Sequence, residues 1–258
     1  MLDAPAFILG PAIIVSLAAV SLVSLLLVRR FVLPRLRLKE SDSEFVGAMV
    51  QSVMVFYGLA LALIAVNVWQ TYNDVSKTVS TEATAFATLY RDVGGYPEPV
   101  RSQVRAEIGG YVDQIIHGAW PIMRKGQVPT EGVQWMDRVQ AHLFAFEPAT
   151  EGQKILHAET LAAFNRANLA RRLRVDAVGT GLPGVMWAVI LIGAVISISA
   201  SFFFRVDDGR VHALLVGLLA ALMGLVIFMT VVLDHPFRGD LGLTAEPYQL
   251  VYDQLMKH

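Results

Sequence analysis

The chain has 258 residues, of which 55% are hydrophobic and 17% are charged. Soluble domains carry about a quarter charged residues, so this composition indicates a membrane protein. The formal net charge of −1 provides no overall basic field for nucleic acid. The absence of cysteine excludes disulfides, thiolate metal sites and cysteine nucleophiles.

Four runs without acidic or basic residues are long enough to cross a membrane, because about 20 apolar residues suffice. They are Ala4–Val28, Phe45–Asn73, Ala177–Phe204 and Val211–Leu233, the last interrupted by His212. We expect no cleavable signal peptide, since no basic residue precedes the first run and that run exceeds the hydrophobic core of a signal. The spacing groups the runs into two pairs.

The second run continues as a helix beyond the membrane. After Trp69 the sequence becomes polar, but an apolar stripe at spacings of three and four continues through Val75, Val79, Ala83, Phe86 and Tyr90. The sequence predicts one uninterrupted helix from Phe45 to Val93, about 70 Å long.

The region between the two pairs has the composition of a soluble helical bundle. Apolar stripes predict helices over Val104–Trp120, Val133–Leu143 and Ile155–Leu173, the first ending near Pro121. Thr150 and Gln153 form a capping box. We therefore predict an all-α integral membrane protein in four segments. They are the first transmembrane pair (1–73), an extramembrane helical bundle (74–178), the second pair (179–234) and a C-terminal turn and tail (235–258).

Catalytic motifs are missing from the sequence. It has no glycine-rich phosphate loop, no HExxH and no GxSxG, and its histidines show no ligand spacing. The sequence predicts neither an enzyme nor a metal site, and no cofactor.

Gln51 interrupts the second run with an amide. Because an amide facing lipid is costly, we expect it to face water or a hydrogen-bonding partner helix. Gln51, Val55 and Leu59 share one helical face. Around a symmetry axis this face would form a narrow, mostly apolar neck, which can gate by dewetting.

The last two runs carry small residues at four-residue spacing, which let helix backbones approach closely. Ala220 and Gly224 are one such pair, and Gly193, Ser197 and Ser201 form a longer series. They indicate either packing within one chain or contacts between subunits.

Basic residues near the membrane ends are candidate sources of positive potential at the mouths of a pore: Arg29, Arg30, Arg171, Arg172 and Arg174. The alternative is contact with lipid headgroups or helix ends.

Basic residues do not orient the chain by the positive-inside rule, because they are nearly balanced. The short-loop side has Arg29, Arg30, Arg35, Arg37, Lys39, Arg205 and Arg210, and the other side has Lys77, Arg166, Arg171, Arg172, Arg174 and Arg238. Short loops alone would favour a bundle outside the cytosol.

Asp234, Pro236, Phe237 and Gly239 predict a tight turn after the fourth run. This Asp-x-Pro-Phe-x-Gly sequence resembles the turn after the fourth membrane helix of bestrophins. The second run, leaving the membrane through Trp69 and Tyr72, resembles their pore helix. Further matching positions are Glu82, Leu89-Tyr90, Leu182-Pro183 and Trp187. In order and spacing, the chain resembles the bacterial bestrophin-like family, which is distantly similar to bestrophin anion channels.

The resemblance implies a homo-oligomer, a pentamer, that conducts small anions through a neck at Gln51, Val55 and Leu59. It also implies a bacterial inner (plasma) membrane protein whose helical bundle is cytoplasmic. The alternative is a non-conducting signalling or scaffold protein, or an accessory subunit of a larger membrane complex. A channel requires the second-run helices to surround a common axis, whereas a scaffold does not.

Overall fold

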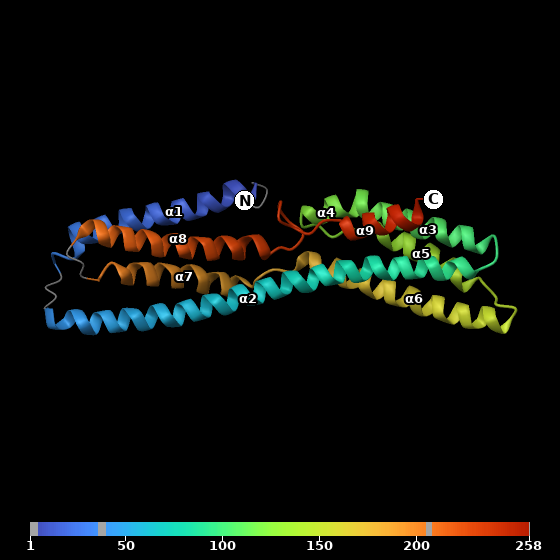
Figure 1. The fold of residues 1–258 in the computed structure, drawn as a ribbon, viewed down its shortest axis with the longest axis horizontal. Helices are drawn as coiled ribbons and strands as arrows, with labels where there is room; N and C mark the ends of the chain where they lie inside the picture. Colours follow the sequence, from blue (N-terminus) through green and yellow to red (C-terminus); the bar gives the residue numbers. More distant parts are fainter. Residues whose placement is uncertain (1–4, 36–39, 205–207, 258) are drawn as a thin grey trace. The chain divides into compact units, whose positions relative to one another are not determined.

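The computed structural model describes residues 5–35, 40–204 and 208–257, without the side chains of residues 40–46. Within these ranges every regular element is a helix, which confirms the all-α prediction (Figure 1). Contacts divide the described chain into two units. Unit 1 extends to Gln70 and resumes from Gly181 to Asp234, and unit 2 contains Thr71–Thr180 and the residues from His235 onward.

Unit 1 contains the membrane helices. They are α1 (Ala6–Leu27, extended by a π-helical turn over Val28–Val32), the first part of α2 (Glu40–Asp92), α7 (Gly184–Ser201) and α8 (Gly209–Leu233) (Figure 1). In the described residues, four helices are long and apolar enough to span a membrane, as predicted. The chain is therefore an integral membrane protein.

Close helix packing holds unit 1 together. A methyl group added at Gly224 of α8 would lie 3.0 Å from the backbone of Ile14 in α1, so the small residue permits this approach. On α7, Gly193 lies against the ring of Tyr57, whose hydroxyl donates to the Ile190 carbonyl at 2.6 Å. These small residues therefore serve packing within one chain.

The third membrane helix begins at Gly184 rather than at Ala177, where its apolar run starts. Proline disfavours a helical conformation for the residue before it, so Pro183 separates the run into two parts. Residues Ala177–Gly179 form a 3₁₀ turn at the end of the preceding helix instead.

α2 is one continuous helix from Glu40 to Asp92, followed by a 3₁₀ turn over Val93–Gly95. The predicted long helix is confirmed. Its apolar half belongs to unit 1, and its amphipathic half contributes Val79, Phe86 and Leu89 to the core of unit 2.

Unit 2 is a bundle of helices around the second half of α2. They are α3 (Val100–Gln114), α4 (Trp120–Arg124), α5 (Gly132–Phe144), α6 (Glu151–Asp176) and α9 (Glu246–Val251, extended by a π-helical turn over Tyr252–Met256). The capping box of Thr150 and Gln153 is present at the start of α6. α9 has no counterpart among the predicted elements.

The helix expected to end near Pro121 instead continues through it. A π-helical turn over Ile115–Ala119 precedes the proline, and α4 follows. Proline lacks a backbone N–H, and the changed hydrogen-bond pattern of a π-helical turn lets the helix continue without this donor. The chain then reverses at Gly126, where φ is +72°, a conformation that favours glycine.

Candidate functional site

The membrane part of α2 has two distinct faces. Tyr57 and Leu61 are buried in the core of unit 1. On the other side, Val55 is 62% exposed and Leu59 is 59% exposed. A single copy of the chain therefore leaves the side chains expected at the neck uncovered.

Gln51 lies on the same uncovered face of α2 and is exposed. Its side chain has no hydrogen bond to another part of the chain that the structure describes. Among the described residues, this amide therefore has no hydrogen-bonding partner on another helix of the same chain.

The five basic residues expected at pore mouths have different environments. Arg30 and Arg172 are exposed, and Arg29 lies against Gly209 at the start of α8. Arg171 is buried in unit 2 beside Gly132, and Arg174 is buried and paired with a carboxylate. A compensated, buried charge creates little field outside the protein, so Arg174 differs from the prediction.

Of the residues used to judge orientation, Arg37, Lys39 and Arg205 lie outside the described residues.

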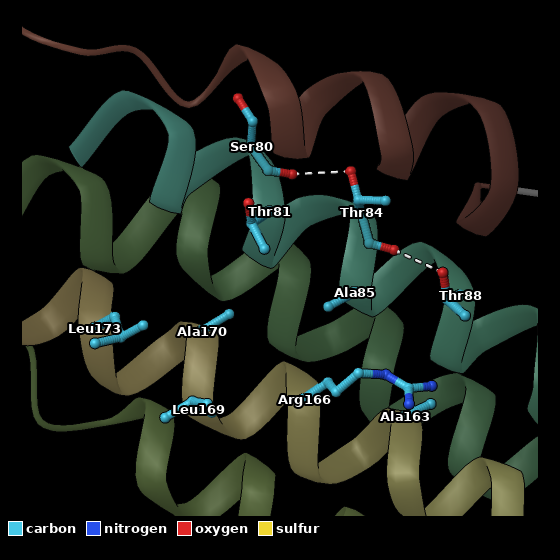
Figure 2. Close-up of a pocket in the computed structure, with 10 residues that line it drawn as sticks. All are labelled: Ser80, Thr81, Thr84, Ala85, Thr88, Ala163, Arg166, Leu169, Ala170 and Leu173. Atoms are coloured by element: carbon cyan, nitrogen blue, oxygen red, sulfur yellow. Dashed lines mark hydrogen bonds between the residues drawn. The ribbon is translucent and has the colours of Figure 1, made fainter. Parts of the chain in front are cut away.

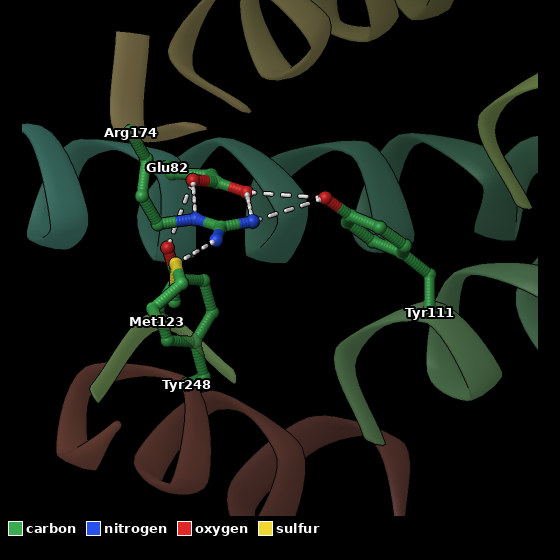
Figure 3. Close-up of polar contacts among 5 residues, drawn as sticks. All are labelled: Glu82, Tyr111, Met123, Arg174 and Tyr248. Atoms are coloured by element: carbon green, nitrogen blue, oxygen red, sulfur yellow. Dashed lines mark hydrogen bonds and ion pairs between the residues drawn. The ribbon is translucent and has the colours of Figure 1, made fainter. Parts of the chain in front are cut away.

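Arg174 belongs to a buried polar cluster that joins five helices of unit 2 (Figure 3). Its Nε donates to Glu82 Oε2 at 2.6 Å and its Nη2 to Glu82 Oε1 at 3.2 Å. The hydroxyl of Tyr111 donates to Oε1 at 3.3 Å and that of Tyr248 to Oε2 at 2.9 Å. The remaining Nη1 contacts the sulfur of Met123 at 3.0 Å. α2, α3, α4, α6 and α9 each contribute one side chain.

The Glu82 and Arg174 side chains are 0% and 2% exposed. Removing two charges from water is costly, and their attraction compensates only when further hydrogen bonds complete the geometry. Here the two tyrosine hydroxyls donate these further hydrogen bonds to the Glu82 carboxylate. The cluster therefore has an architectural role in fixing the arrangement of unit 2.

Protonation of the cluster is strongly biased. Burial raises the pKa values of the Tyr111 and Tyr248 hydroxyls, and the negative charge of Glu82 raises them further. For Arg174, burial alone would lower the pKa, but the adjacent Glu82 outweighs it and the pKa is raised. The two tyrosines stay neutral donors and Arg174 stays charged across the physiological range.

The melting temperature in detergent should fall as pH rises above about 10, the pKa of an unfolded tyrosine. The folded state holds the phenolic protons of Tyr111 and Tyr248 more tightly than the unfolded state does. Their contribution to the free energy of unfolding is therefore complete below pH 10 and is lost as the pH rises above it. Each phenol contributes up to about 1.4 kcal/mol per pH unit. Tyr248→Phe should therefore give a shallower decline, measured by thermal melts from pH 8 to 11. Identical slopes in the two proteins would contradict this.

Within unit 1, Asp234 of the turn sequence binds Leu182 and Trp187, which belong to another of the family-matching positions. Its Oδ1 accepts the Leu182 backbone N–H at 2.5 Å, and its Oδ2 accepts the indole N–H of Trp187 at 3.3 Å. Both contacts fix the start of α7 against the end of α8.

After Asp234, Phe237 packs edge-on against Trp120 within unit 2, and Gly239 adopts a φ of +74°. Pro236 accepts a backbone hydrogen bond from Leu243 at 2.8 Å.

Asp234→Ala should lower stability by about 1–3 kcal/mol, because it leaves the Leu182 and Trp187 donors without their carboxylate. The thermal melting temperature in detergent measures the loss. Asp240→Ala is the matched control, since Asp240 is an exposed residue of the same turn. Equal melting temperatures for the two variants would show that Asp234 has no anchoring role.

A groove of about 540 Å³ lies between α2 and α6 in unit 2 (Figure 2). On α2, the hydroxyls of Thr84 and Thr88 donate to carbonyl oxygens one turn earlier in the same helix. On α6, Leu169 and Leu173 expose apolar side chains. The hydroxyl protons of Thr84 and Thr88 are therefore already used. Among the described lining residues Arg166 alone carries a charge, and we assign no ligand here.

The sequence did not identify Tyr111 and Tyr248, whose hydroxyls donate to Glu82, or the buried His212 as site residues. Pro247 at the start of a helix, followed by apolar residues at 248, 251 and 255, was the available signal for α9. In the described residues, no group of three or more histidine, aspartate or glutamate side chains is arranged to hold a metal.

Comparison with known proteins gives two matches. The model of the Bestrophin-like domain family matches residues 15–248. The fold is similar to the crystal structure of a mutant bacterial bestrophin homologue from Klebsiella pneumoniae, with a TM-score of 0.69 and 9% sequence identity over 98% of each chain. No curated protein sequence matches the chain significantly.

The family match covers most of the chain, from within α1 to α9, and the fold match covers nearly all of it. The chain belongs to the bestrophin-like family.

Proposed function

We propose that this chain forms a homo-oligomeric channel that conducts small anions through a neck formed by Gln51, Val55 and Leu59 of α2. Membership of the bestrophin-like family supports a channel of the bestrophin type. We further propose a pentamer in a bacterial inner membrane with the helical bundle on the cytoplasmic side.

The observation that carries the proposal is the uncovered face of α2. Val55 and Leu59 are exposed on a protomer whose Tyr57 and Leu61 are buried. Gln51 on this face is an amide within the membrane run, and an amide facing hydrocarbon is costly. Several copies around one axis would cover the apolar side chains and give the amide water or a neighbouring copy.

The proposed neck is narrow and mostly apolar, so water and ions would pass only when it is wetted. Arg30 and Arg172 are exposed and Arg29 is partly exposed, so these are the proposed mouth charges. They would raise the local anion concentration near the membrane ends. Arg171 and Arg174 are buried, and we leave them out.

The direct experiment is anion flux from liposomes that contain the purified chain. Chloride should leave protein-containing liposomes faster than protein-free ones, while potassium efflux stays at the protein-free rate. Absence of flux from both the original chain and a variant with alanine at Val55 and Leu59 would favour a non-conducting scaffold.

A further inference from the structure

Arg171 of α6 is a nearly buried cation that the rest of unit 2 does not neutralise. The residue is only 9% exposed. Among the described residues, its guanidinium forms no ion pair and donates no hydrogen bond. Burying a charge is costly unless it is paired and hydrogen-bonded, so this guanidinium indicates an acceptor supplied from outside the chain.

Two carboxylates of unit 2 could be expected to neutralise Arg171, and both are used elsewhere. The buried Glu82 is engaged by Arg174 and by two tyrosine hydroxyls. Glu131, the residue before α5, is exposed, and its carboxylate accepts from the side-chain amide of Gln114 at 3.5 Å. Unit 2 therefore retains one positive charge here without compensation.

The guanidinium of Arg171 lies against the start of α5. A Cβ added at Gly132, the first residue of this helix, would lie 3.4 Å from both Nε and Nη2 of Arg171. Among the described residues no side chain caps α5, and the Val133 N–H reaches the Thr130 carbonyl only at 3.5 Å. Unpaired N–H groups give a helix start a partial positive charge. Two positive features therefore meet, an arrangement that a bound anion would stabilise.

The outer edge of the guanidinium is accessible. Of the three nitrogens of Arg171, only Nε is completely covered, whereas Nη1 and Nη2 retain accessible surface. Thr130 and Val133 at the start of α5 are exposed, so this end of the helix lies at the protein surface. Two neighbouring guanidinium nitrogens can donate in parallel to two oxygens of one oxyanion. A tetrahedral oxyanion has further oxygens for the N–H groups of a helix start.

We propose that Arg171 and the start of α5 bind a phosphate group. A soluble phosphate and a lipid headgroup present the same oxygens, so the chemistry of recognition is shared by both sources. The site belongs to unit 2 and uses none of the residues of the proposed neck. The inference goes beyond the proposed function and does not depend on ion conduction.

The first test is isothermal titration calorimetry of the purified full chain in detergent with inorganic phosphate. Phosphate should bind, whereas sodium chloride at the same ionic strength should give no binding heat. A second arm compares melting temperatures in nanodiscs of phosphatidylcholine with and without phosphatidic acid, since a ligand that binds the folded state raises the melting temperature. Binding of inorganic phosphate identifies a soluble source, and an effect of phosphatidic acid alone identifies a lipid headgroup.

Two variants and one control accompany both arms. Arg171→Met removes both donors and should weaken phosphate binding about a hundredfold, and Arg171→Lys, which loses the paired geometry, about tenfold. Either variant should also abolish or reduce a shift caused by phosphatidic acid. Arg172→Met is the matched control, because Arg172 is the exposed neighbour on α6 and the net charge changes equally. Circular dichroism checks each fold, and Arg171→Lys keeps the test decisive if Arg171→Met does not fold.

Three results would overturn the proposal. Binding heat from chloride equal to that from phosphate would show general charge screening rather than an oxyanion site. An equal loss of binding in Arg172→Met and Arg171→Met would show that only net charge matters. Absence of an effect from both inorganic phosphate and phosphatidic acid would show that Arg171 binds no phosphate group.

Discussion

Alanine at both Val55 and Leu59 should raise anion flux through the reconstituted protein about tenfold, which corresponds to a barrier lowered by about 1.4 kcal/mol. Both side chains are apolar and uncovered on the protomer. Smaller side chains would widen the proposed neck and admit water more easily. Chloride efflux from liposomes measures the change, and single-channel recording would separate conductance from open probability.

Leu191→Ala is the matched control for the neck variant. Leu191 is an aliphatic residue on α7 that is 52% exposed, so it has a similar exposure on a different membrane helix. Its flux should equal that of the original chain. A rise with Leu191→Ala, or none with the Val55 and Leu59 change, would contradict a neck at these positions.

Glu82→Gln should destabilise the protein by about 3–5 kcal/mol, because it leaves the buried Arg174 charge without its counter-ion. For a chain of this size the melting temperature should fall by about 10 °C. The purified variant in detergent, heated and followed by circular dichroism, gives the measurement. Arg101→Met is the control: Arg101 forms an exposed pair with Glu98, and exposed pairs contribute at most about 1 kcal/mol.

The double variant Glu82→Gln with Arg174→Met should recover most of that loss. Replacing both charges removes the uncompensated ion, and methionine retains much of the apolar volume of arginine. A melting temperature near that of the original chain is expected. If instead the losses of the two single variants add, the two side chains are not energetically coupled and the cluster does not hold unit 2 together.

The membrane helices and the long α2 were predictable because their signals are local. Charge-free runs and a repeating apolar stripe are properties of consecutive residues, and they require no knowledge of partners. The two boundary differences, at Ala177 and at Pro121, arise where proline has opposite effects. Pro183 delays the start of α7, whereas a π-helical turn lets the chain continue through Pro121.

The buried cluster could not be predicted in the same way, because its members are distant in sequence. Glu82 and Arg174 are 92 positions apart, and Tyr248 is 166 positions from Glu82. In sequence, Arg174 belongs to a basic group at a helix end, which is typical of solvated or lipid-facing residues. Its carboxylate partner becomes apparent only after α2 and α6 pack together. Glu82 itself was a family-motif position without an assigned partner.

The most direct measurement is a single-particle electron-microscopy reconstruction of the purified protein in lipid nanodiscs. We expect rotational symmetry, with Val55 and Leu59 of every copy nearest the common axis. A reconstruction that directs these two side chains toward lipid, or that contains a single protomer, would contradict the proposed channel.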